Sequence, residues 1–335
     1  MNKTVYVVSE HTDKLKMLGR TRFTPKGLEL SWSGSGCAIS PCARRIVLTF
    51  ADAGASASPV MVGVYVNGKK ETHALQGERA LVVVEAEEGI TALSVLRLSA
   101  GDQALYLESI ELWGEDELAL LPPPEKKKNK ILFIGDSITC GYGTDSSSSH
   151  NIYHTWEEDV THAYAYLTAE HFDADYQIIA ISGQGIVLNC RGEHGRLFCE
   201  FFGQANRTPT PVPDESGFSP RLVVVNGGTN DNGKPVPQED FKEGVDHLLT
   251  LLRANYPDAY ILWIYGAMNA PYHQVLVQVF DERQKTDENM SYVNARPIYD
   301  NPAFVGANGH PTHLGQIDLA EQLTKHIHAL GLFEE

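Results

Sequence analysis

Residues 131–143 read ILFIGDSITCGYG, and the rest of the chain can be interpreted outward from this stretch. Four apolar residues follow a lysine-rich segment, a pattern typical of a buried strand in a parallel sheet. The apolar run ends at Gly135, Asp136 and Ser137. Because open α/β sheets bind ligands at the carboxyl ends of their strands, we expect Ser137 at a ligand site. Glycine and aspartate also favour turns and helix caps, so a simple turn is the alternative interpretation.

Three later segments have a similar character. They are 180–185 (AISGQG), 223–231 (VVVNGGTND) and 309–315 (GHPTHLG). The first two end apolar runs typical of buried strands, and the third precedes an amphipathic helix pattern. Taken with residues 135–137, they resemble the four sequence blocks of the SGNH, or GDSL-type, hydrolase superfamily. The resemblance extends over about residues 130–335.

Length and charge narrow the class of protein. A chain of 335 residues predicts two domains, and no apolar stretch is long enough to span a bilayer. The formal charge of −16 argues against binding to nucleic acid or anionic membranes, while a neutral ligand such as a sugar is compatible with it. Five cysteines do not form a disulfide framework. No signal peptide is visible in the first 20 residues, so we expect a cytoplasmic protein.

Residues 1–120 are expected to form an all-β domain, a β-sandwich or jelly roll. Short apolar strands alternate with turns, and no long stretch has helical periodicity. Asn67-Gly68 is a strong hairpin signal. The alternation after Leu107 changes phase. The expected strands cover 27–32, 46–50, 60–66, 80–86 and 105–113.

Residues 121–130 contain three prolines and four lysines, which predicts an extended, solvated linker. After it, apolar strands alternate with helix patterns, and this alternation predicts a mostly parallel sheet covered by helices on both faces. The superfamily resemblance implies an SGNH-type, flavodoxin-like catalytic domain at 131–335. Expected strands are 131–135, 176–181, 221–226 and 259–265, and expected helices are 161–171, 239–254 and 312–330.

A serine and a histidine are the expected reactive groups. A serine hydroxyl is a weak nucleophile that needs a base within hydrogen-bonding reach, and a histidine can accept and return a proton near neutral pH. The resemblance assigns Ser137 as nucleophile and places the base directly before a proline. It therefore selects His310 over His313.

Ala307 departs from the superfamily pattern, in which an aspartate lies three residues before this histidine. That aspartate would orient the imidazole and stabilise its protonated form. We expect either a Ser–His dyad with a backbone carbonyl as the orienting group, or a substitute side chain completing a triad. The substitute candidates are the carboxylate of Asp300 and the side chain of Asn308.

The resemblance also implies an oxyanion hole. Its donors would be the backbone N–H groups of Ser137 and Gly183 and the side-chain amide of Asn230. Asp136 and Asp231 would support these residues without reacting. Trp156, Trp263 and Tyr265 are candidate substrate contacts, because sugar rings stack on aromatic side chains, but such residues also form cores.

We expect no cofactor and no metal. The pairs His150/His154 and His310/His313 have helical spacing, yet neither belongs to a metal-binding motif. The paired glycines at 34–36 and 141–143 lack dinucleotide or phosphate-loop spacing and are interpreted as turns.

A β-sandwich before an SGNH domain resembles carbohydrate esterase family 2. This resemblance implies a serine acetylesterase acting on acetylated xylan, mannan or glucomannan oligosaccharides, with no nucleic-acid or membrane partner. Two alternatives stay open: another GDSL-type esterase, lipase or thioesterase, and a non-catalytic carbohydrate-binding protein. The substrate sugar and the oligomeric state do not follow from the sequence.

Overall fold

The computed structural model describes residues 2–54, 58–115, 117–146, 149–208, 210 and 212–333. The chain forms two compact units. The first comprises Met1–Lys126 with two later segments, His154–Trp156 and Ala205–Ser216. The second comprises Lys127–Tyr153, Glu157–Gln204 and Gly217–Glu335.

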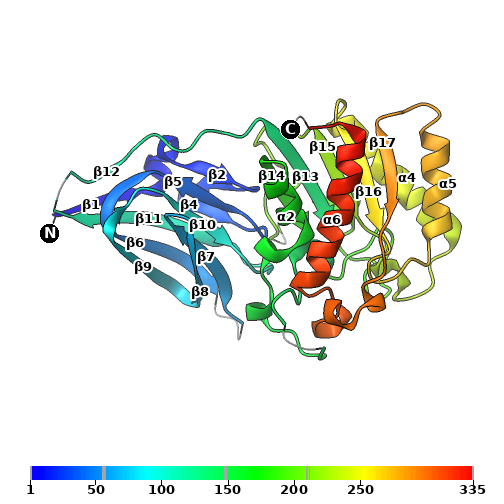
Figure 1. Cartoon of the computed structure of the whole chain (residues 1–335), viewed down its shortest axis with the longest axis horizontal. Helices are drawn as coiled ribbons and strands as arrows, with labels where there is room; N and C mark the ends of the chain where they lie inside the picture. Colours follow the sequence, from blue (N-terminus) through cyan, green and yellow to red (C-terminus); the bar gives the residue numbers. More distant parts are fainter. Residues whose placement is uncertain are drawn as a thin grey trace. The chain divides into compact units, whose positions relative to one another are not determined.

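The first unit contains two antiparallel sheets, as Figure 1 shows in blue and cyan. One sheet has the order β12-β6-β11-β4-β3, with β1 paired to β11 and β9 paired to β6. The other has the order β2-β5-β10-β7-β8. Their bounds are β1 Asn2–Val7, β2 Lys16–Leu18, β3 Arg22–Thr24, β4 Gly27–Leu30, β5 Gly36–Ile39, β6 Pro41–Gly54, β7 Val60–Val66, β8 Lys69–Leu75, β9 Gly77–Ile90, β10 Leu93–Arg97, β11 Leu105–Gly114 and β12 Ala119–Leu120. Short 3₁₀ turns η1 (Val8–Glu10) and η2 (Thr12–Lys14) follow β1.

Side chains from both sheets form one buried apolar cluster. Leu48 and Ile110 enter it from the first sheet, and Val62 and Val95 enter it from the second. Burial of both inner faces in a common core is the architecture of a β-sandwich, and the all-β prediction is confirmed. The phase change after Leu107 is a β-bulge, where the pairing of β11 with β6 shifts register.

The hairpin predicted at Asn67-Gly68 joins β7 to β8, with Val66 opposite Lys69. Both turn residues have positive φ angles, 48° and 85°, as a two-residue hairpin of this kind requires. The Asn67 side chain also accepts hydrogen bonds from the backbone N–H groups of Thr91 and Ala92. The turn is therefore bonded to the residues that lead into β10, the strand that pairs with β7.

The segment Ala205–Ser216 belongs to the first unit, although the sequence placed it in the catalytic domain. The buried indole of Trp32 donates a hydrogen bond to the carbonyl of Ala205. Arg20, whose side chain is fully buried, forms an ion pair with Asp214 at 3.2 Å. These contacts join residues far apart in the chain, which explains why a single boundary near residue 120 does not describe both units.

The second unit is built on a parallel sheet with the order β14-β13-β15-β16-β17. The strands are β13 Asn129–Gly135, β14 Ala174–Ala180, β15 Leu222–Asn226, β16 Tyr260–Tyr265 and β17 Met290–Asn294. Numbered from the start of this unit, the order is 2-1-3-4-5, which is the flavodoxin-like arrangement. The sheet predicted from the sequence is confirmed, and β17 is an additional edge strand.

Helices cover both faces of this sheet (Figure 1). Phe133 and Trp263 point to opposite faces, because Phe133 pairs with Val224 whereas Trp263 pairs with the next residue along β15. The Phe133 ring contacts Tyr164 of α2, and the Trp263 ring contacts Phe280 of α5. The helices are α1 Ser137–Cys140, α2 Tyr164–His171, α3 Phe198–Phe201, α4 Gln238–Asn255, α5 His273–Arg283 and α6 His313–Leu330.

Several 3₁₀ turns form the loops between these elements. They are η3 Thr155–Glu157, η4 Val160–His162, η5 Asn230–Asn232, η6 Ile298–Asp300, η7 Pro302–Phe304 and η8 Ala307–Gly309. Helix α6 begins after Thr312, whose hydroxyl accepts from the N–H of Gly315, and ends at Gly331 in the left-handed conformation. Within the described residues, none of the helices is both long and apolar enough to cross a membrane.

Candidate active site

Ser137 lies just after the carboxyl end of β13, an interior strand of the parallel sheet, where the short helix α1 begins. Asp136 caps this helix by accepting a hydrogen bond from the N–H of Ile138 at 3.0 Å. Gly135 is needed for close packing, since a Cβ atom there would lie 2.0 Å from the hydroxyl oxygen of Thr139. The nucleophile candidate is thus held on a tight strand-to-helix turn, with only 4% of its surface exposed.

Ser137 and His310 meet, although 173 positions separate them in the sequence. The Oγ atom of Ser137 lies 2.8 Å from Nε2 of His310. Burial lowers the pKa of His310 to about 4, and two nearby backbone hydrogen bonds, at Asn308 and Ala307, oppose this shift. A neutral imidazole in this position can accept the serine proton.

The other ring nitrogen of His310 faces a backbone group. Nδ1 lies 3.2 Å from the carbonyl oxygen of Asn308, in the turn η8. This carbonyl takes the orienting place for which Asp300 and the Asn308 side chain were candidates. Asp300 is exposed in η6, and the described residues show no bond between it and the imidazole. The Asn308 side chain bonds to Tyr142 instead, so neither side-chain candidate contacts the ring in this structure, whereas the backbone carbonyl expected for a dyad does.

Tyr142 holds this turn in place. Its hydroxyl accepts a hydrogen bond of 2.5 Å from the side-chain amide of Asn308, and its ring centroid lies 4.3 Å from that of His310. Asn308 has a φ angle of 51°, in the left-handed region that asparagine adopts more readily than most residues with a side chain. The side-chain bond to Tyr142 stabilises a conformation that aims the Asn308 carbonyl at the imidazole.

Gly183 lies in the loop after β14, beside the nucleophile strand. Gly135 and Ala180 are partners in the parallel ladder, which brings the loop that begins at Ile181 next to Ser137. Gly183 has a φ angle of 78°, a conformation that glycine adopts without strain. The predicted oxyanion donor is therefore at the expected edge of the sheet.

Asp231 fixes the continuation of this loop. Its carboxylate accepts hydrogen bonds from the backbone N–H groups of Ile186, Val187 and Leu188 at 2.7–3.0 Å. Burial raises the pKa of Asp231, and the three hydrogen bonds act in the opposite direction. The supporting role expected for Asp231 has a clear structural form: it holds the loop that carries Gly183.

Asn230 is held by two acceptors. Its amide donates to Asp136 at 3.0 Å and to the carbonyl of Gln184 at 2.9 Å. An oxyanion would therefore have to share one of these two amide hydrogens. Burial raises the pKa of Asp136 to about 7, with a smaller contribution from the nearby Asp231 charge. Asp136 therefore connects the first turn of helix α1 with the side-chain amide of Asn230.

Of the three aromatic residues predicted as substrate contacts, two lie in the core and one lies on the surface. Trp263 and Tyr265 are buried in β16, where the Trp263 indole donates to the Gly227 carbonyl. Neither ring offers a face to a substrate, and their prediction as substrate contacts is wrong. Trp156 is 55% exposed and stacks on His154 in the first unit. Its role as a substrate contact stays a prediction.

Two positioning residues, Tyr142 and Gln316, were not among the residues predicted from the sequence. Tyr142 lies within a Gly-Tyr-Gly run that the sequence analysis interpreted only as a turn. Gln316 of α6 is fully buried, donates to the carbonyl of Ile138 and accepts from the N–H of Tyr164. It thereby ties the last helix to the helix that carries the nucleophile. A buried glutamine inside an amphipathic pattern was the available signal.

Two curated proteins have sequences similar to that of this chain. The chain is 30% identical over 220 residues to the cellulase/esterase CelE of Acetivibrio thermocellus, covering 62% of this chain and 26% of the relative. It is 27% identical over 210 residues to an acetylxylan esterase/glucomannan deacetylase of Cellvibrio japonicus, covering 61% and 58%. The matched part of the chain thus spans about a quarter of the length of the first relative and somewhat more than half of the length of the second.

A solved structure has the same two-part fold. A family two carbohydrate esterase from Clostridium thermocellum, in complex with cellohexaose, superposes with a TM-score of 0.84 and 25% identity. The match covers 95% of this chain and all of that one. A family two carbohydrate esterase from Cellvibrio japonicus, at 20% identity and a TM-score of 0.86, shares the fold.

The family model for GDSL-like lipases and acylhydrolases matches residues 133–323. This range begins in the nucleophile strand β13 and ends within α6, so it contains both Ser137 and His310. More than half of the chain is therefore matched, and the chain belongs to the GDSL-like lipase/acylhydrolase family.

Proposed function

We propose that this protein is a serine esterase that removes O-acetyl groups from acetylated xylan, mannan or glucomannan oligosaccharides. The observation that carries the proposal is the 2.8 Å contact between Ser137 Oγ and His310 Nε2. The acetylated-sugar substrate is supported by the names of the similar proteins, which are a cellulase/esterase, an acetylxylan esterase/glucomannan deacetylase and a family two carbohydrate esterase. The flavodoxin-like sheet alone would not distinguish such an enzyme from other hydrolases.

The first half of the reaction forms an acetyl-enzyme. Ser137 Oγ attacks the acetyl carbonyl carbon while Nε2 of His310 takes the hydroxyl proton. The new oxyanion is stabilised by the N–H groups of Ser137 and Gly183 and by the Asn230 amide. The bond between the carbonyl carbon and the sugar oxygen then breaks, and His310 returns its proton to that oxygen.

The second half releases acetate. His310 removes a proton from a water molecule, which attacks the acetyl-enzyme, and the serine leaves with the proton returned by His310. The Asn308 carbonyl orients the imidazole throughout, so the base works as a dyad. The absence of a carboxylate lowers the stabilisation of the protonated imidazole, while the oxyanion donors retain much of the rate enhancement.

The nucleophile is tested by Ser137→Ala, measured as acetate release from an aryl acetate and from acetylated xylo-oligosaccharides. We expect a loss of about a thousandfold or more in kcat, because removal of a nucleophile abolishes the covalent route. The chain contains a matched control: Ser291 Oγ lies 3.0 Å from His326 Nε2 in β17 and α6. Ser291→Ala removes another serine–histidine hydrogen bond and should leave turnover unchanged. Retained turnover in Ser137→Ala would show that the nucleophile is elsewhere.

The acyl and sugar specificity need separate measurements. A series of aryl esters from acetate to octanoate should show the highest kcat/KM for acetate. A maximum beyond butyrate would favour a lipid esterase or thioesterase instead. Mass spectrometry of acetylated manno-, glucomanno- and xylo-oligosaccharides should record losses of single acetyl groups. Binding of these oligosaccharides with no mass loss would favour a carbohydrate-binding protein.

A further inference from the structure

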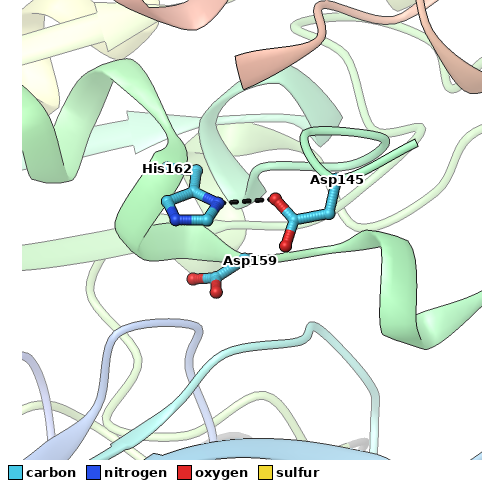
Figure 2. Close-up of side chains that lie close together, drawn as sticks. All are labelled: Asp145, Asp159 and His162. Atoms are coloured by element: carbon cyan, nitrogen blue, oxygen red, sulfur yellow. Dashed lines mark hydrogen bonds and ion pairs between the residues drawn. The ribbon is translucent and has the colours of Figure 1, made fainter. Parts of the chain in front are cut away.

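Three potential metal ligands gather near the turn that follows α1, outside the catalytic residues. One ligand atom from each of Asp145, Asp159 and His162 lies within 4.8 Å of the other two (Figure 2). Of the described residues, only these three bring such a set of histidine, cysteine or carboxylate atoms together. The sequence expectation of no metal considered histidine pairs and did not include this group.

Two neighbouring backbone segments present the ligands. The N–H of Asp159 donates to the hydroxyl of Thr144 at 3.0 Å, and the N–H of Asp145 donates to the carbonyl of Glu157 at 3.1 Å. The N–H of His162 donates to the carbonyl of Asp159, which closes the turn η4. The positions of all three ligands are thus set by backbone hydrogen bonds, and an ion would bind to a preformed frame.

The side chains are also constrained. Asp159 is 4% exposed, and its Oδ1 atom accepts from the N–H and the hydroxyl of Thr161. The His162 ring stacks on His313, with centroids 4.2 Å apart and planes 14° apart. Nδ1 of His162 and Oδ1 of Asp145 are 2.5 Å apart and face each other (Figure 2). For coordination, His162 Nδ1 and Asp145 Oδ1 would give up their shared proton and move apart by about 1 Å.

The three side chains offer two carboxylates and one imidazole to a single point. We propose that Asp145, Asp159 and His162 bind one divalent first-row transition-metal ion, such as Zn²⁺. Imidazole nitrogen and carboxylate oxygen are both ligands of Zn²⁺, at about 2.0–2.2 Å. Three protein ligands leave at least one position for water.

The ion would act on structure and not on the reacting ester. The N–H of His313, the first residue of α6, donates to the carbonyl of Thr144 at 2.8 Å. Ser146, one residue after Asp145, accepts from the N–H of Ala307 in the turn that precedes His310. A metal at Asp145 would therefore fix the 144–146 turn against η4 and limit the motion of the loop that carries the base.

The test measures metal content and stability directly. The full chain is treated with EDTA, dialysed against micromolar Zn²⁺, and analysed for bound zinc and for its melting temperature. We expect one ion per chain and a higher melting temperature in the presence of Zn²⁺, because an ion that binds the folded state stabilises it. Asp145→Asn and His162→Gln should each weaken zinc binding by at least about tenfold.

His150→Gln is the matched control, because His150 pairs with Glu157 at 2.9 Å in the same region and lies outside the three-residue group. This variant should bind zinc as the unchanged protein does. Failure to retain zinc in the unchanged protein would overturn the proposal. Zinc binding by Asp145→Asn and His162→Gln as tight as that of the unchanged protein would also overturn the proposal. The ion would then lie at another group, such as the exposed Cys42 or Cys190. Neither readout uses turnover, so both are independent of the esterase proposal.

Discussion

The imidazole of His310 receives its orienting contact from a backbone carbonyl, because the side chain at position 307 is only a methyl group. A carbonyl dipole can select the ring tautomer, but it balances the positive charge of a protonated imidazole less well than a carboxylate does. Burial is therefore the dominant influence on His310, and it lowers the pKa to about 4.

The pH profile of kcat/KM should show this directly. A protonated His310 cannot accept the serine proton, so kcat/KM should fall as the pH decreases through about 4 and stay level from there to neutrality. The same lowered pKa contributes folding stability above about pH 6.5, which is lost as the pH falls through about 4. An acid limb near pH 6.5 would contradict the prediction and would indicate an unrecognised carboxylate beside the ring.

Tyr142 and Asn308 should act together as positioning residues. Tyr142→Phe keeps the ring against His310 and removes the hydrogen bond to Asn308, which should lower kcat about three- to tenfold, the equivalent of one neutral hydrogen bond. KM should change little, since the substrate does not use this bond.

A double-mutant cycle distinguishes this role from general destabilisation. Asn308→Gly removes the same bond, and glycine accepts the φ angle of 51° without strain. The double variant should lose no more activity than the larger single loss. Additive losses would mean that the two residues act independently. Tyr292→Phe, in the edge strand β17, is the control for loss of a tyrosine hydroxyl.

At the scale of elements, Asp136 joins helix α1 to the turn η5. One carboxylate oxygen accepts from the N–H of Ile138, and the other accepts from the amide of Asn230. An asparagine has a single acceptor oxygen and can serve only one of these donors. Asp136→Asn should therefore either uncap α1 or release Asn230, and we expect kcat to fall about ten- to hundredfold from misplaced donors.

The same variant should change the dependence of stability on pH. The pKa of Asp136 is raised to about 7, so the folded state holds a proton that the unfolded state releases near pH 4. Stability from this group is complete below about pH 4 and is lost as the pH rises through about 7. Urea unfolding between about pH 4 and 8 should show this decline in the unchanged protein and a smaller one in Asp136→Asn. An equal decline in both proteins would assign it to another group.

Helices and strands could be predicted from the sequence where a buried face gives a regular pattern of apolar residues. The apolar runs of β13 and β15 and the periodicity of α4 and α6 were recognisable because these elements have buried faces. Helix α5 was missed, since its valines at 275, 277 and 279 alternate as in a strand. Strand β17 was missed because it is a half-buried edge strand with polar residues. Reactive side chains were recognisable by type, whereas the orienting group at Asn308 is a backbone carbonyl and has no sequence signature.

At the scale of the whole molecule, the first unit includes a segment that the chain supplies much later. Ala205 is 173 positions from Trp32, and the bond between them depends on tertiary structure that a local pattern does not encode. Arg20 has no exposed side-chain surface, and the Asp214 carboxylate, 3.2 Å from its guanidinium, offsets part of the cost of burying that charge. Breaking such a pair typically costs about 3–5 kcal/mol.

A fragment comprising residues 127–335 should therefore be less stable than its sheet and helices suggest. It retains Ala205–Ser216 but lacks Trp32 and Arg20, the residues that bind this segment in the first unit. We expect a lower melting temperature and faster proteolytic cleavage at residues 205–207, which are buried in the full chain. Asp214→Ala in the full chain is the comparison, because it removes one of these contacts while the first unit is present. Equal protease resistance of fragment and full chain would show that the segment folds without those partners, since exposure of a segment governs its cleavage.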